Sequence, residues 1–149
     1  MSAEVVSVST SEEKGIKKVP VKEGLLVKGL GIEGDAHAGN WHRQVSLLGI
    51  ESIQKMRTLG ADVGPGDFAE NITTRGIELF SLPVGTKLII GKAILEVSQI
   101  GKVCDKPCEI FKAVGDCIMP REGIFAKVIK GGRVKEKVPI HIESEDDKR

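Results

Sequence analysis

The sequence predicts a mainly β protein, built as a closed or nearly closed β-barrel with short helices at its rim. Eighteen of the 149 residues are glycine, and they recur between short runs of β-branched residues and leucine. Runs of this kind, bounded by turn residues, are typical of many short strands with tight connections. Strand-like runs outnumber helical ones, and the length suits one domain over residues 1–149.

Each expected strand is a short apolar run. Strands are predicted at residues 5–9, 24–27, 44–48, 84–90, 93–100, 125–129 and 133–142. Gly91 and Lys92 form a two-residue loop that begins with glycine, which predicts a β-hairpin. The almost wholly charged residues 143–149 are expected to fray into solvent.

One amphipathic helix is predicted over residues 50–59. Ile50, Ile53 and Met56 fall on one helical face, and Gly60 provides a C-terminal stop. This helix is expected at the rim of the barrel.

Composition excludes several classes of function. The 22 basic and 21 acidic residues leave a net charge of +1, so no overall field favours nucleic acid or a membrane surface. Aromatic residues make up 3% with no tyrosine, so the stacking platforms of single-strand binders are largely missing. No signal peptide and no long apolar run is seen, and we expect a cytoplasmic protein. Neither a nucleophile elbow nor a dinucleotide-binding glycine motif is present.

Cysteine chemistry is expected in one segment. Cys104 and Cys108 lie four residues apart among lysines, and Cys108 follows Pro107 at the start of a helix-like run. A helix N-terminus and nearby lysines favour the thiolate, the form that binds soft metals or carries sulfur. Cys108 is therefore the predicted reactive thiol, with Cys104 as its rival. Cys117 lies among apolar residues, and the spacing of the three fits no common zinc or iron–sulfur motif.

A long polar loop at residues 31–44 leads into a predicted strand. Asp35, His37, His42, Arg43 and Gln44 would make a polar wall for an oxygen-rich ligand, with Arg43 suited to bidentate recognition of phosphate. The alternative is an ordinary turn at Gly34-Asp35. The two histidines are one residue further apart than a zinc-binding pair on one helix face, so zinc is disfavoured.

A second glycine-bearing loop spans residues 64–74. Its backbone N–H groups, with Asn71 and Thr73, can cradle an anion, although a glycine turn before a strand explains the same pattern. Arg121 lies in a Pro-Arg-Glu-Gly turn that could aim it into a pocket.

In combination and order, several short motifs resemble the MOSC family, named for the C-terminal domain of molybdenum-cofactor sulfurases. They are Gly34-Asp35-Ala36-His37, His42-Arg43-Gln44, residues 66–73, Leu82-Pro83-Val84-Gly85, Cys108 and residues 120–125. The resemblance covers roughly residues 5–140 and is greatest to the small stand-alone bacterial members.

The resemblance implies a pyruvate-kinase-type barrel with a pocket for the molybdenum cofactor in its molybdopterin form. It implies Cys108 as the residue that binds molybdenum or carries sulfur, and Glu70, Asn71 and Thr73 at the pterin phosphate. A site lysine is implied near the amino-terminal end, at Lys18, with Lys17 and Lys22 as alternatives. Pyridoxal phosphate binding is a further association of the family.

Three functions remain open at this point. The chain either reduces N-hydroxylated compounds with a separate electron-donor protein, or handles sulfur for the cofactor. Alternatively, it is a non-catalytic carrier beside cofactor biosynthesis enzymes. The third hypothesis is a structural or zinc-stabilised barrel.

Overall fold

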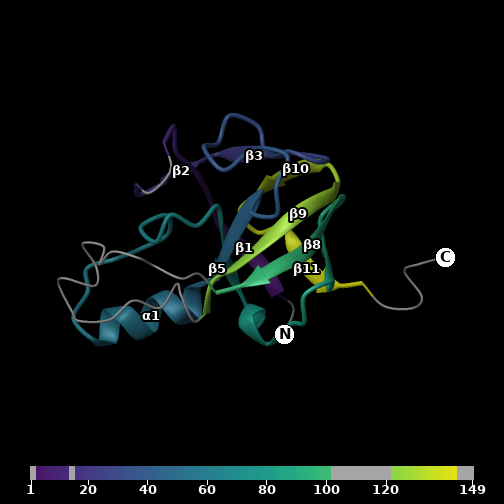
Figure 1. Cartoon of the computed structure of the whole chain (residues 1–149). Helices are drawn as coiled ribbons and strands as arrows, with labels where there is room; N and C mark the ends of the chain where they lie inside the picture. Colours follow the sequence, from purple (N-terminus) through teal and green to yellow (C-terminus); the bar gives the residue numbers. More distant parts are fainter. Residues whose placement is uncertain (1–2, 14–15, 102–121, 144–149) are drawn as a thin grey trace.

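The computed structural model describes residues 3–13, 16–101 and 122–143 (Figure 1). The predictions on Cys104, Cys108, Cys117 and Arg121, and on the tail beyond Glu143, lie outside these residues. The described elements are β1 Ala3–Thr10, β2 Val19–Val21, β3 Glu23–Val27, β4 Gly31–Ile32, β5 Val45–Gly49, α1 Ile50–Thr58, β6 Ile72–Arg75, η1 Leu79–Ser81, β7 Lys87–Ile90, β8 Ala93–Ile100, β9 Ile124–Lys130, β10 Gly132–Lys135 and β11 Pro139–Ile142.

The predicted closed barrel is confirmed. Seven strands of the described chain follow the order β11-β7-β8-β9-β5-β6-β1, and the antiparallel pairing of β1 with β11 closes the ring. β2 pairs with β1 outside this ring, and β10, β3 and β4 form a small separate sheet. None of the described helices is long and apolar enough to cross a membrane.

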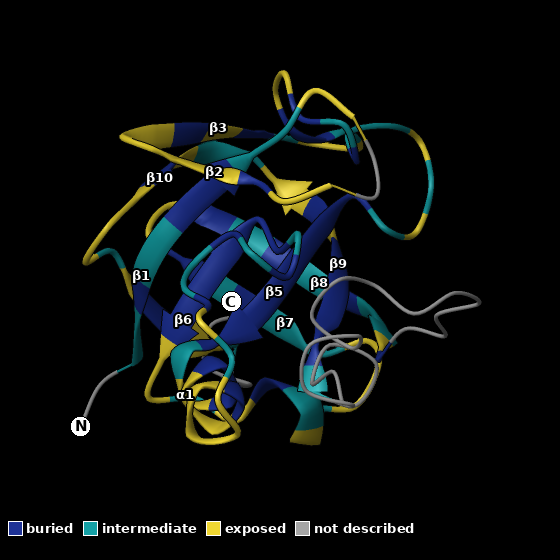
Figure 2. Ribbon diagram, turned by 90° about the vertical axis from the view of Figure 1, so that its left-hand side faces the viewer, coloured by how far each residue is buried: buried dark blue, intermediate teal, exposed yellow. Residues whose placement is uncertain are grey.

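Side chains that alternate along the strands divide the barrel into an inner and an outer face. Val45, Leu47 and Ile72 belong to the main apolar core, together with residues from the other barrel strands. Their sequence neighbours point outward, and Leu48 and Phe125 pack in a second apolar cluster with residues of α1. The ribbons of β5, β6 and β9 are coloured as buried over most of their length (Figure 2). The outer face of β5, β6 and β9 is therefore covered as well, by α1 and by loops.

The expected hairpin and helix are confirmed. β7 and β8 pair antiparallel around Gly91, whose φ of 61° suits glycine at the first position of such a turn. α1 ends at Thr58, and Gly60 follows with a φ of 100°.

The predicted last strand over 133–142 is wrong, because it is two strands in two sheets. β10 pairs with β3, whereas β11 joins the barrel between β7 and β1. The break coincides with a turn at residues 135–138, in which the Val138 N–H donates to the Lys135 carbonyl at 3.3 Å and Lys137 has a left-handed φ of 73°.

Two other boundaries also differ. Residues 72–74, the end of the predicted loop at residues 64–74, belong to β6, which runs parallel to β5. The strand predicted from residue 84 begins at Lys87, because Pro83 to Thr86 form a turn closed by a backbone hydrogen bond of 3.1 Å.

Candidate functional site

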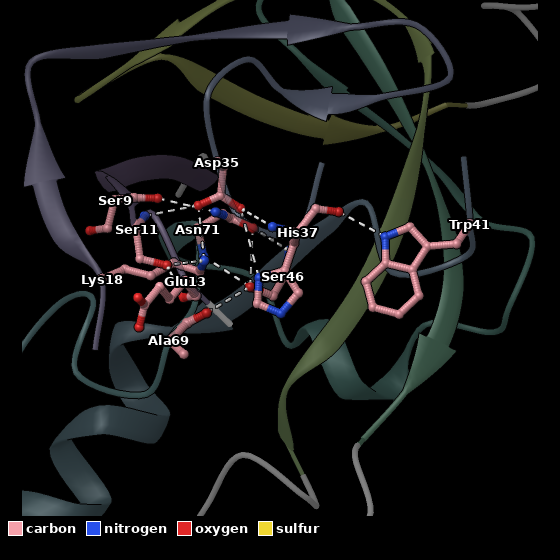
Figure 3. Close-up of polar contacts among 10 residues, drawn as sticks. All are labelled: Ser9, Ser11, Glu13, Lys18, Asp35, His37, Trp41, Ser46, Ala69 and Asn71. Carbon is pink, nitrogen blue, oxygen red and sulfur yellow. Dashed lines mark hydrogen bonds and ion pairs between the residues drawn. The ribbon is translucent and has the colours of Figure 1, made fainter. Parts of the chain in front are cut away.

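Lys18 and Asp35 form a buried ion pair beside Ser11 and Asn71 (Figure 3). The Lys18 Nζ lies 2.9 Å from Oδ1 of Asp35, and neither side chain is exposed. Lys18 also donates to the Ser11 hydroxyl, and the Ser11 N–H donates to the same Asp35 oxygen at 3.0 Å. Two segments of the chain that lie 17 residues apart are thereby locked together.

His37 completes this cluster from the same loop as Asp35. Its backbone N–H donates to Oδ2 of Asp35 at 2.9 Å, which closes a local turn. Burial by itself raises the pKa of Asp35, but the hydrogen bonds from His37 and Lys18 outweigh it and hold the pKa well below its ordinary value. Asp35 is therefore a fixed negative charge, neutralised by Lys18.

Arg43 belongs to a neighbouring cluster built around Phe125. The guanidinium carbon lies 5.2 Å from the centre of the Phe125 ring, and Nε donates to the Gln99 side chain at 3.0 Å. The His37 ring lies 6.4 Å from the same phenyl ring, and His42 contacts Gln99 at 2.9 Å. Phe125 thus brings the Arg43 and His37 side chains to one place.

Glu70 is the centre of a third cluster and is fully buried. The backbone N–H groups of Gly66 and Phe68 donate to its two carboxylate oxygens, and the Thr73 hydroxyl donates at 2.7 Å. Burial raises the pKa of Glu70 above its ordinary value, although the Gly66 and Thr73 hydrogen bonds act in the opposite direction.

Asn71 connects the strands beneath these clusters. Its Oδ1 accepts from the Ser46 N–H at 2.9 Å, and its Nδ2 donates to the Ser9 carbonyl at 3.1 Å. The Asn71 side chain also stabilises the ionised form of Asp35. Asn71 therefore joins β1, β5 and the start of β6.

Gly66 joins the Glu70 cluster to the Lys18 segment. Its carbonyl accepts from the Lys18 N–H at 2.8 Å, and its φ is 89°. A Cβ at this position would lie 2.2 Å from the Lys18 carbonyl oxygen, so the close approach requires glycine.

The structure thus brings together most of the predicted site residues that it describes. Lys18, Asp35 and His37 share one cluster, Glu70 and Thr73 another, and Arg43 lies beside His37 at Phe125. The chain leaves and re-enters the described structure next to Arg43. The Gly101 N–H donates to the Gly123 carbonyl at 2.6 Å, and Gln99 pairs with Phe125.

Several residues of these clusters were not predicted as site residues. Ser11, Ser46, Gln99 and Phe125 join the clusters through partners that are distant in sequence, whereas Trp41 donates to the His37 carbonyl four residues away. In the described part of the chain, no group of three or more His, Cys, Asp or Glu residues is placed to hold a metal ion.

A separate pocket of about 260 Å³ lies at the N-terminal end of α1. Glu51, Lys55, Phe80 and Glu122 contribute to its lining, and Lys55 donates to both oxygens of Glu122. None of the described residues predicted to bind the cofactor lines it.

Residues 34–141 match the family model of the MOSC domain. The chain belongs to the MOSC domain family. The family is associated with binding of the molybdenum cofactor and with sulfur handling.

Solved structures show the same fold. The YuaD protein from Bacillus subtilis superposes with a TM-score of 0.80 at 21% identity, with 97% of each chain covered. YiiM from Geobacillus stearothermophilus gives a TM-score of 0.69 at 19% identity, covering 95% of this MOSC chain and 75% of that one. YiiM from Escherichia coli gives 0.66 at 24% identity, covering 97% and 71%. No curated protein matches the sequence significantly.

Proposed function

We propose that this MOSC chain binds the molybdenum cofactor in its molybdopterin form against the outer face of the barrel, and uses it to reduce N-hydroxylated compounds. The observation that carries the proposal is the convergence of Arg43 and His37 on Phe125, where the chain leaves and re-enters the described structure. Family membership points to the cofactor, and this cluster has the chemistry to bind its anionic end.

The donor set fits a phosphate-bearing ligand. Arg43 is partly buried, and among the described residues only its Nε is used in a hydrogen bond. A planar guanidinium held over an aromatic ring can direct its remaining N–H groups to two oxygens of one phosphate. The charges of Lys18 and Asp35 cancel each other. Arg43 is therefore the cation that attracts an anionic ligand to this place.

The other predicted residues hold the site in shape. The side chains of Asn71, Thr73 and Glu70 are buried and hydrogen-bonded within the protein. Their part in the proposal is to fix the two loops, whereas Arg43 and His37 face the ligand. When bound, the cofactor would supply a redox-active molybdenum centre, and the electrons would come from a separate donor protein.

Cys108 is proposed as the molybdenum ligand, with Cys104 as the alternative. A soft thiolate suits molybdenum, and Cys108 has the sequence surroundings that favour the thiolate. Replacing Cys108 with serine substitutes a hard, protonated hydroxyl, and should abolish molybdenum retention while the barrel still folds.

The test is expression in a host that makes the cofactor, followed by molybdenum and pterin analysis of the purified chain. Wild type should carry both, Arg43→Ala should lose most of the pterin, and Arg133→Ala is the matched control because Arg133 is exposed and pairs with Glu23 in the small sheet. A wild-type chain without molybdenum or pterin would refute the proposal. Turnover of an N-hydroxylated substrate with an artificial electron donor separates a reductase from a carrier or sulfur-handling protein.

A further inference from the structure

His37 contains a buried nitrogen that the hydrogen-bond network leaves incomplete. Its Nδ1 is buried and has no hydrogen-bond partner within the described residues. The nearby Oδ2 of Asp35 lies 3.7 Å away, just beyond hydrogen-bond distance. Side-chain exposure of His37 is 10%, and this exposed part belongs to atoms other than Nδ1.

The orientation of the His37 ring is fixed on several sides. Trp41 stacks on it, with ring centres 6.2 Å apart and planes within 8°, and the Trp41 indole N–H donates to the His37 carbonyl at 2.7 Å. Phe125 packs against it at a tilt. In this orientation Nδ1 lies toward Asp35, and the second ring nitrogen, Nε2, points away from it (Figure 3).

Asp35 is fixed in the same way. Its Oδ1 accepts from Lys18 and from Ser11, and its Oδ2 accepts from the backbone N–H of His37. A carboxylate held beside one imidazole nitrogen favours the tautomer with the proton on that nitrogen, and leaves the other nitrogen to exchange a proton. Such hydrogen bonds are often long in a site without ligand, and shorten when a ligand binds.

We propose that His37 exchanges a proton through Nε2 with the ligand bound beside Arg43, and that Asp35 and Lys18 are positioning residues for this step. The inference rests on the proposed function. Reduction of an N-hydroxylated compound takes two electrons from the donor protein and two protons; the N–O bond breaks, and an amine and water are released. His37 supplies one proton, to the oxygen that leaves, and solvent supplies the other.

The first test measures the tautomer of His37 in the chain without cofactor, by nitrogen-15 NMR of the imidazole rings. The chain has only three histidines, so single substitutions of His37, His42 and His141 assign every signal. The neutral His37 ring should carry its proton on Nδ1, and Asp35→Asn should move the proton to Nε2, because an amide can turn its N–H₂ group toward the ring. A proton on Nε2 in the wild-type chain would overturn the proposal.

The second test uses the cofactor-loaded enzyme. His37→Gln should lower turnover per bound molybdenum about 100-fold or more, and imidazole added to His37→Ala should restore part of it. His141→Gln, at an exposed position of β11, is the matched control. Full turnover by loaded His37→Gln would overturn only the role of His37, whereas a wild-type chain that holds no cofactor would overturn the proposed function and the proton transfer together.

Discussion

Asp35 and Glu70 are two buried carboxylates in adjoining loops, and the protein treats them in opposite ways. The hydrogen bonds of Asp35 with His37 and with the ammonium of Lys18 outweigh the effect of burial, so its pKa lies below the ordinary value. Glu70 accepts from two backbone N–H groups and one hydroxyl, and burial raises its pKa. Burial alone therefore does not decide the charge of a carboxylate, since the kind of donor around it matters as much.

The difference assigns the two loops different tasks. The Asp35 loop carries the Lys18–Asp35 ion pair, and the carboxylate of this pair lies next to the His37 ring. The Glu70 loop is held by neutral donors, and its carboxyl group organises Gly66, Phe68 and Thr73. The loops meet where the Gly66 carbonyl accepts from the Lys18 N–H.

Removal of the buried cation should have the largest effect. Lys18→Met leaves Asp35 without its charge partner in a site with no solvent access, and should lower the free energy of unfolding by about 3–5 kcal/mol. Lys17→Met is the control, because Lys17 is exposed. Urea denaturation of the two variants measures the difference, and equal midpoints would show that the ion pair contributes nothing.

The second largest effect is expected at Gly66, where the Glu70 loop contacts the Lys18 segment. Gly66→Ala combines a left-handed backbone with a Cβ that meets the Lys18 carbonyl oxygen, and should cost about 2–4 kcal/mol. Gly85→Ala measures the cost of the left-handed backbone alone, because Gly85 has a φ of 96° and no atom lies within 4 Å of its Cβ position. A similar loss of stability in both variants would mean that the contact with Lys18 is unimportant.

The barrel was predictable because its cause is local. Alternating apolar residues, glycine turns and the Gly91 hairpin loop are written in short stretches of sequence, and all are found in the structure. The parallel pairing of β5 with β6 was not predictable, because the glycines before Ile72 suggest a loop and the partner strand lies far back in the chain. The left-handed conformation of Lys137, which divides the final strand, has no signal in its residue type.

For the candidate site, polar residue types in glycine-bearing loops pointed to Asp35, His37 and Arg43, and the family resemblance pointed to Glu70. Their binding of a ligand stays a prediction, and the structure places them in adjoining clusters. The sequence did not predict which of the two carboxylates would pair with an ammonium. Whether a buried carboxylate meets an ammonium or only neutral donors depends on segments that are brought together by closure of the barrel, such as residues 11–18 beside residue 35.

Glu70→Gln should give a moderate loss of stability whose pH dependence is opposite in sign to that of Asp35→Asn. An amide retains one acceptor, so at least one donor to Glu70 loses its partner, at a cost of about 1–3 kcal/mol. Because folding raises the pKa of Glu70, its stabilising contribution is complete below the ordinary value of 4.5 and declines as the pH rises through the raised pKa. The advantage of wild type over Glu70→Gln should therefore shrink as the pH rises above 4.5.

For Asp35 the sign reverses. Folding lowers its pKa, so its contribution is present above the ordinary value of 3.8 and is lost as the pH falls below it. The advantage of wild type over Asp35→Asn should grow from pH 3 to pH 5. Parallel pH profiles for the two variants, measured by urea denaturation, would contradict the distinction between the two carboxylates.

The smallest effect is expected at Ala69, in the loop that Glu70 organises. Ala69 has a φ of 62°, and its carbonyl accepts from the Ser46 hydroxyl at 3.1 Å. A left-handed alanine costs about 1 kcal/mol, but glycine gives the unfolded chain more freedom, worth about 0.4–1 kcal/mol. Ala69→Gly should therefore leave the free energy of unfolding within about 0.5 kcal/mol of wild type, from the difference of these terms.

Lys137→Gly is the control for Ala69→Gly, because Lys137 has a φ of 73° at an exposed site outside both loops. If the hydrogen bonds of Glu70 hold the loop in this conformation, the two glycine variants should behave alike in the wild-type background. In a Glu70→Gln background the loop has fewer hydrogen bonds to hold a glycine at residue 69 in this conformation. Ala69→Gly should then lower the free energy of unfolding more than in wild type, while the effect of Lys137→Gly stays unchanged. Additive effects of Ala69→Gly and Glu70→Gln on the unfolding free energy would show that the conformation of Ala69 does not depend on Glu70.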